Sequence, residues 1–99
     1  LALLLIAALS GCSNTCDRMC DVQVELMERC FDTWGTSWQQ ESYDDSQEFL
    51  DRCYAVWGDE LDSLDADSLE YSDFNDRCER QLQVAISDVD CESPLLIEP

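Results

Sequence analysis

The sequence contains no histidine and no lysine, and both absences restrict its chemistry. Without histidine, neither a Ser-His-Asp nor a Cys-His catalytic site can form within the chain. Without lysine, a Ser-Lys pair is excluded as well. Paired carboxylates can act as acid and base, but 23 acidic residues make coincidental pairs inevitable. No pair is distinguished by a recognisable apolar pocket, so we expect no catalytic residues, no cofactor and no enzyme activity.

Positive charge is also scarce, since five arginines face 23 acidic residues and leave a net charge of −18. Such a surface repels phosphate backbones and anionic lipid head groups, which excludes nucleic acid as a partner. Three interpretations of the charge remain: a solubilising coat suited to high salt, recognition of a cationic protein partner, or loose binding of divalent cations. A calcium loop from Asp65 to Asp76 fails, because Leu69 and Glu70 occupy a ligand position and the required glycine position. We therefore expect no metal site.

Long apolar runs are missing too, and the longest is the nine-residue stretch from Leu1 to Leu9. A transmembrane helix needs roughly 20 such residues, whereas nine suit the hydrophobic region of a secretory signal. Neither an initiator methionine nor a basic segment precedes the run. We expect residues 1–11 to be a signal peptide, truncated at its N-terminus and removed on maturation.

The apolar run ends in Leu9-Ser10-Gly11-Cys12, which resembles the lipobox of bacterial lipoproteins. In that class a leucine and two small residues precede a cysteine whose sulfur receives diacylglycerol. The signal is cut directly before this cysteine, and the new amine is often acylated. The resemblance covers residues 1–12 and implies lipidation at Cys12, with a short tether over residues 12–15. The alternative is an ordinary signal peptide cut after Ser10 or Gly11, with Cys12 as a disulfide partner.

The resemblance also implies a location. Two or three acyl chains hold a protein on a bilayer essentially permanently, because each buried methylene contributes about 0.8 kcal/mol. We therefore expect an exported protein anchored to the membrane of a bacterial cell envelope. Ser13, in place of aspartate after the lipidated residue, favours the outer over the inner membrane by similarity to enteric systems.

The number of cysteines supports lipidation, because an odd total of seven becomes an even six without Cys12. An even set in an exported domain predicts three disulfides. The six are Cys16, Cys20, Cys30, Cys53, Cys78 and Cys91. Zinc is disfavoured because only Cys16 and Cys20 have suitable spacing and histidine is absent. A redox pair is disfavoured because there is no C-x-x-C motif.

Apolar spacing predicts three helices. The first spans about 16–34 and stops at Gly35. The second is capped by Ser42 or by a residue from Asp44 to Ser46 and stops at Gly58, and the third follows Ser72 or Asp73. The apolar positions are Cys16, Met19, Cys20, Val22, Val24, Leu26, Met27, Cys30, Phe31 and Trp34 in the first helix, Phe49, Leu50, Cys53, Val56 and Trp57 in the second, and Phe74, Cys78, Leu82, Ala85, Ile86 and Val89 in the third. Residues 36–46 are expected to form a loop with a helical turn, and residues 59–73 an acidic connector.

These elements predict a small all-α domain over residues 16–93, a disulfide-stapled bundle of about three helices followed by a tail at 94–99. In an up-down-up bundle, Cys30 and Cys91 lie near one end, which predicts that they pair. Cys16 and Cys20 then take Cys53 and Cys78, in an order left open. The aromatic residues are expected to fill the core rather than to line a ligand groove. They include Trp34, Trp38, Tyr43, Tyr54 and Trp57.

Two functions fit these features. The first is a small, acidic, cysteine-rich envelope lipoprotein that acts without catalysis, as a structural or protein-interaction module anchored by Cys12. The alternative is a binding protein for a cation or a small ligand, through the acidic segment 59–73.

Overall fold

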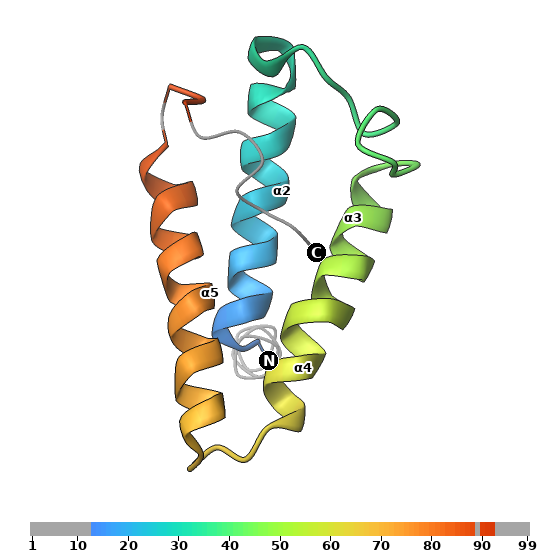
Figure 1. The fold of residues 1–99 in the computed structure, drawn as a ribbon. Helices are drawn as coiled ribbons and strands as arrows, with labels where there is room; N and C mark the ends of the chain where they lie inside the picture. Colours follow the sequence, from blue (N-terminus) through green and yellow to red (C-terminus); the bar gives the residue numbers. More distant parts are fainter. Residues whose placement is uncertain (1–12, 89, 93–99) are drawn as a thin grey trace, which may run out of the picture.

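The computed structural model describes residues 13–88 and 90–92, which form three helical rods (Figure 1). The rods are α2 (Thr15–Trp34), a composite second rod, and α5 (Leu69–Ser87). The composite rod joins α3 (Ser46–Cys53), the π-helix η1 (Tyr54–Gly58) and α4 (Asp59–Ser63) without a break. No strand occurs among the described residues, so the predicted all-α fold is confirmed. The predicted signal peptide, Cys12, Val89 and the tail at 94–99 lie outside the described residues.

The first rod, α2, has a clear start and a clear stop. Asn14 caps its N-terminus, and the Asn14 side chain accepts a hydrogen bond from the backbone N–H of Asp17 at 2.8 Å. The Asp17 carboxylate in turn accepts from the Asn14 backbone N–H, which completes a capping box. Gly35 ends the helix with φ of 70°, a left-handed conformation that glycine adopts without steric cost. The predicted helix over 16–34 is confirmed within one residue.

The second rod is longer than the sequence predicts. Asp45 caps it, accepting from the Glu48 backbone N–H at 2.9 Å. The predicted stop at Gly58 is wrong, because the chain stays helical to Ser63. Gly58 lies inside a wider turn in which the Asp59 backbone N–H donates to the carbonyl of Tyr54, five residues back. A glycine inside a helix is a weak stop signal when neighbouring side chains pack over it.

The π-helical turn decides which side chains of the second rod reach the core. Phe49, Cys53, Trp57 and Leu61 are all buried at a regular spacing of four residues. In a plain α-helix this spacing drifts around the axis, since a turn holds 3.6 residues. The extra residue in the wider turn compensates for the drift. The predicted burial of Val56 is therefore wrong: 43% of its surface is exposed.

The third rod, α5, begins earlier than predicted. Its cap is Ser68, whose hydroxyl accepts from the Tyr71 backbone N–H at 3.1 Å, rather than Ser72 or Asp73. The acidic connector 59–73 is consequently reduced to a tight turn over residues 64–68 between two helices. Leu61 is fully buried, whereas Leu69 is 82% exposed.

The core forms where the other two rods pack against α2, which lies between them in Figure 1. The larger cluster fills the interface of α2 with the second rod and with Cys78 and Leu82 of α5. The smaller one joins Leu26 and Cys30 of α2 to Ala85 of α5. The prediction that Ile86 is buried is wrong, because α5 turns Leu82 and Ala85 toward α2 and leaves Ile86 54% exposed.

Aromatic residues of the 36–46 loop close one end of the larger cluster. Trp38 stacks edge-on against Phe31 with ring centroids 4.7 Å apart, and Tyr43 packs against Phe49 at 5.3 Å. Trp57 is buried in the same cluster and Tyr54 packs against it from the side. The prediction that aromatic residues fill the core is confirmed for Tyr43 and Trp57, which are each 7% exposed.

Candidate functional site

The six cysteines form three disulfides, and α2 supplies one partner to each. Cys16 pairs with Cys78, Cys20 with Cys53, and Cys30 with Cys91. The predicted Cys30–Cys91 pair is confirmed, and the order left open for Cys16 and Cys20 is decided. Their Cα–Cα distances are 5.1, 5.9 and 5.4 Å, typical of unforced bridges.

The disulfides close large loops and therefore contribute strongly to stability. Sequence separations are 62, 33 and 61 residues. In the chain-entropy view, loops of this length are worth about 4 kcal/mol each. Such bracing compensates for the self-repulsion of a chain with net charge −18.

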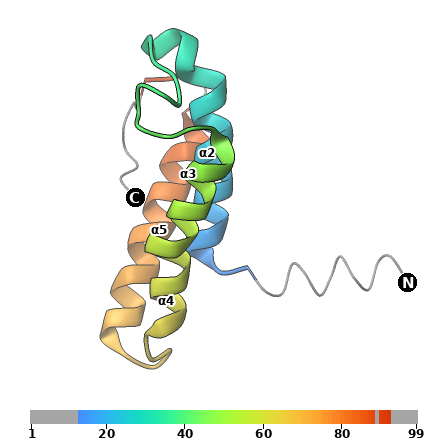
Figure 2. The ribbon, with the colours of Figure 1, turned by 90° about the vertical axis from the view of Figure 1, so that its right-hand side faces the viewer.

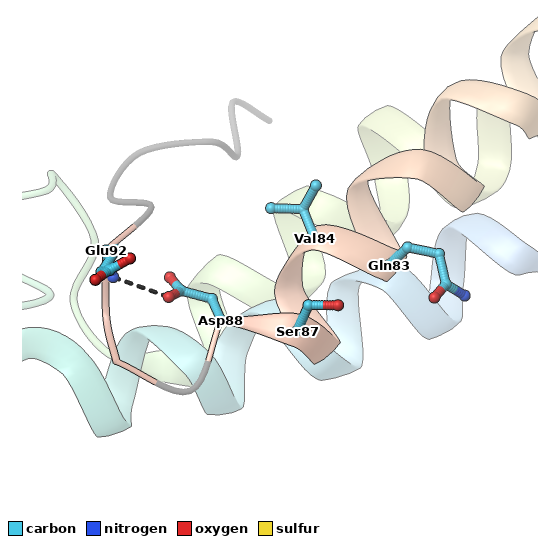
Figure 3. A pocket seen from close by; sticks show the side chains of 5 residues that line it. All are labelled: Gln83, Val84, Ser87, Asp88 and Glu92. Atoms are coloured by element: carbon cyan, nitrogen blue, oxygen red, sulfur yellow. Dashed lines mark hydrogen bonds between the residues drawn. The ribbon is translucent and has the colours of Figure 1, made fainter.

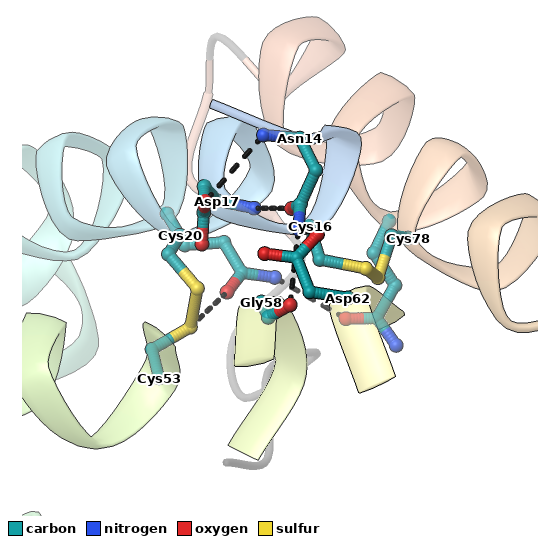
Figure 4. Close-up of a disulfide and its surroundings, with 10 residues drawn as sticks. Asn14, Cys16, Asp17, Cys20, Cys53, Gly58, Asp62 and Cys78 are labelled. Carbon is teal, nitrogen blue, oxygen red and sulfur yellow. Dashed lines mark hydrogen bonds between the residues drawn. A yellow bond between two sulfur atoms is a disulfide. The ribbon is translucent and has the colours of Figure 1, made fainter. Parts of the chain in front are cut away.

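The N-terminus of α2 meets the second rod at a polar contact that we call the acidic junction, made of Asn14, Asp17, Gly58 and Asp62 (Figure 4). The Asn14 amide nitrogen donates to the Gly58 carbonyl at 3.0 Å and to an Asp62 carboxylate oxygen at 2.9 Å. A Cβ at position 58 would overlap the carboxylate of Asp17. Glycine at this position therefore allows the Asp17 side chain to lie directly against the second rod.

Asp17 is the electrostatically strained member of the acidic junction. Its pKa is raised above the ordinary aspartate value, first because burial disfavours the charged form. The backbone N–H of Asn14 lowers the pKa, but the nearby charges of Asp62, Asp21 and Asp59 raise it again. The junction thus gathers negative charge that only partly reaches solvent.

An open hollow of about 360 Å³ lies beside the acidic junction. Its lining residues are Ser13, Asp17, Asp21, Tyr54 and Asp59. The Tyr54 hydroxyl donates a hydrogen bond to the Asp21 carboxylate. Burial, followed by this hydrogen bond and the charge of Asp21, raises the pKa of Tyr54, so its hydroxyl stays protonated at neutral pH.

Only part of the predicted ligand segment 59–73 reaches this hollow. Asp59 lines it and Asp62 bonds to Asn14, whereas Asp65, Asp67 and Glu70 are exposed around the turn. Within residues 13–88 and 90–92, no three acidic, histidine or cysteine side chains are arranged to hold a metal ion.

The chain after α5 folds back onto the end of α2. We call the described residues Asp88, Asp90, Cys91 and Glu92 the C-terminal hook. The Trp34 indole nitrogen donates to the Cys91 carbonyl at 2.7 Å, and Arg29 donates to the Asp88 carbonyl at 3.0 Å. The Asp88 carboxylate accepts from the Glu92 backbone N–H at 2.8 Å (Figure 3).

A second open hollow, also about 360 Å³, lies where α5 passes into the C-terminal hook (Figure 3). It is lined by Gln83, Val84, Ser87, Asp88 and Glu92. The apolar contribution is Val84, which is 39% exposed.

A glutamine pair, with Gln23 buried and Gln81 partly buried, is the polar feature that the apolar pattern missed. Gln23 is fully buried between Cys20 and Met27 on α2, and its amide nitrogen donates to the Gln81 side-chain oxygen of α5 at 3.2 Å. The Gln23 side-chain oxygen lies 3.9 Å from the Cys53 sulfur. The sequence contains one signal for this pair: Gln23 lies on the apolar face of the first predicted helix.

No protein-family model, curated protein or solved structure matches this chain. Within the described part of the chain, none of the helices combines the length and the hydropathy that crossing a membrane requires.

Proposed function

We propose that this chain is a small acidic lipoprotein of a bacterial cell envelope, anchored by Cys12 and acting without catalysis as a structural or protein-interaction module. The observation that carries the proposal is the distance along the chain between the lipobox-like cysteine and the folded domain. The helix cap is Asn14, so Ser13 alone separates Cys12 from the braced helices.

Such a short tether fixes how the domain stands on the membrane. Asn14 is bonded both to α2 and to the second rod, so a lipid on Cys12 holds the acidic junction near the bilayer. The 36–46 loop and the C-terminal hook lie toward the other end of α2 (Figure 2), and with this anchor that end is directed away from the membrane. The protein presents one end to partners, as an interaction module requires.

The charge pattern supports a cationic protein as the partner. All three rods carry exposed carboxylates, among them Asp21, Glu25, Glu28, Asp32, Asp51, Asp59, Glu60, Asp62, Glu70, Asp73, Asp76 and Glu79. Arg52 lies over the Tyr43 ring at 4.6 Å and Arg77 over the Trp57 ring at 5.3 Å. Both arginines keep their charge there, but five arginines cannot balance 23 acidic residues, so the surface keeps a negative field that attracts positive partners.

The anchor is tested by intact-mass analysis of protein from the membrane fraction. We expect a mass increase of two or three acyl chains on a chain that begins at Cys12, and six cysteines unreactive to alkylation. The Cys12→Ala variant is expected to gain no acyl mass, with its disulfides unchanged. An unmodified Cys12 thiol in protein from the membrane fraction would contradict the anchor.

A second candidate is capture of a small organic cation at the hollow beside the acidic junction. The raised pKa of Asp17 favours it, because a bound cation would offset the charges of Asp21 and Asp59. Titration calorimetry with spermine and, separately, with calcium tests this function. We expect heat with spermine that is lost in the Asp21→Asn/Asp59→Asn variant. An absence of heat with both cations, and of any rise in melting temperature, would contradict it.

A further inference from the structure

The three disulfides differ in how well they are protected. Cys16, Cys20, Cys53 and Cys78 are fully buried, and both bonds they form join helix to helix inside the larger core cluster. Cys91 is only partly buried and lies outside any helix, in the C-terminal hook. Its sulfur is therefore the one that an external thiol reaches with the least rearrangement.

The C-terminal hook is fastened by hydrogen bonds as well as by the disulfide. The hydrogen bonds from Trp34 and Arg29 attach it to α2, and the Asp88 carboxylate bonds to the backbone of Glu92. Cys91 has a φ of 58°, a left-handed conformation that is strained for a residue with a side chain. A segment that lies outside the helices opens locally at lower free energy than the whole domain.

Opening the hook uncovers an apolar surface. Cys91 and Trp34 pack against the smaller core cluster of Leu26, Cys30 and Ala85. The hollow beside Val84 and Asp88 adjoins the same segment (Figure 3). When the hook departs, this patch loses part of its cover while the larger cluster keeps its own.

We propose that Cys30–Cys91 is a thiol–disulfide exchange site, at which a dithiol reductant opens the C-terminal hook without unfolding the three rods. Cys16–Cys78 still joins α2 to α5, and Cys20–Cys53 still joins α2 to the second rod. The site gives the domain two oxidation states with different surfaces at the end opposite the acidic junction. It concerns the described domain alone and does not depend on lipidation of Cys12.

The exchange balances as two successive displacements. One thiolate of the dithiol attacks the Cys91 sulfur, the bond to Cys30 breaks, and the Cys30 sulfur leaves with the electron pair and takes up a proton. The second thiol of the reductant then attacks the mixed disulfide, closes the reductant's own disulfide and releases Cys91 as a thiol. Two electrons and two protons pass from the dithiol to the protein.

Graded reduction of the native, fully oxidised protein with dithiothreitol tests the proposal. Samples are quenched with iodoacetamide, and the alkylated cysteines are identified by peptide mapping. Cys30 is itself fully buried, so attack begins at Cys91. We expect Cys30 and Cys91 to be alkylated at least about tenfold faster than the other four cysteines, with helical circular dichroism retained at that stage. Simultaneous alkylation of all six, or earlier alkylation of Cys16 or Cys53, would overturn the proposal.

A matched variant separates a switch from a structural clamp. Cys30→Ser/Cys91→Ser mimics the open state and is expected to keep helical circular dichroism and the other two disulfides. Its Trp34 fluorescence should match that of the partly reduced wild type, with Trp34→Phe identifying the signal. If the double variant loses its helices, the bond is needed for folding and is not a switch.

Discussion

The side chain of Asn14 caps α2 and at the same time donates to the carbonyl of Gly58, 44 residues further along the chain. One amide group therefore sets both the start of the first rod and the position of the second. A third bond, to Asp62, extends the contact into α4.

Substitution of Asn14 tests this double role. We expect Asn14→Ala to lower the free energy of unfolding by about 2–3 kcal/mol, because the cap and the bonds to Gly58 and Asp62 are lost together. Asn14→Ser keeps an oxygen that can cap the helix and loses only the amide donor, so its cost should be smaller. Urea unfolding measures both, and equal effects would show that the bridge to the second rod adds nothing to the cap.

The raised pKa of Asp17 predicts a specific dependence on pH. A carboxyl whose pKa is raised in the folded state favours folding most below its unfolded pKa near 3.8, and this contribution disappears as pH rises through the raised value. Asp17→Asn should therefore increase stability at pH 7, by less than about 1 kcal/mol because the site is partly solvated. Thermal melts from pH 3 to 7 measure the effect. Glu25→Gln, an exposed site on the same helix, is the control.

The energetic effects of substituting Gln23 and Gln81 should be coupled. Gln81→Leu removes the acceptor of the Gln23 amide and should cost about 1–3 kcal/mol, because a buried donor is left without a partner. Gln23→Leu/Gln81→Leu removes both polar groups and should cost less than Gln81→Leu alone. Chemical unfolding of both variants makes the comparison, and a double variant that is the less stable of the two would contradict this account.

Loss of the buried disulfides should follow the size of the loops they close. Cys16→Ser/Cys78→Ser is expected to cost about 4 kcal/mol, and Cys20→Ser/Cys53→Ser slightly less, because the loop shortens from 62 to 33 residues. Guanidinium unfolding of each double variant measures the difference. A larger loss for the shorter loop would indicate that packing around Cys53, rather than loop closure, dominates.

The existence of the helices and one of the three cysteine pairs were accessible from the sequence because both depend on spacing along the chain, whereas the partners of Cys16 and Cys20 were not. The apolar face of α2 is continuous, and its end at Gly35 uses a glycine in the left-handed conformation that marks many helix ends. The Cys30–Cys91 pairing follows from an up-down-up order alone, because the first and third rods run parallel and both cysteines then lie near the same end.

The length and the buried face of the second rod could not be predicted from apolar spacing. Gly58 does not end the helix; it leaves room for the Asp17 carboxylate, and this contact is visible only once the two rods are packed together. The π-helical turn then shifts the buried face so that Leu61 replaces Val56. The acidic junction joins residues 44 to 48 positions apart, and no local pattern predicts their contact.

Each of the three disulfides has one cysteine on α2, so the rods stay covalently joined even where the backbone between them is cut. A protease that nicks the 36–46 loop, the turn at 64–68, or both, leaves each fragment covalently tied to the first rod. The severed molecule would migrate as one species until its sulfurs are reduced, so cleavage at these two sites would not release any fragment.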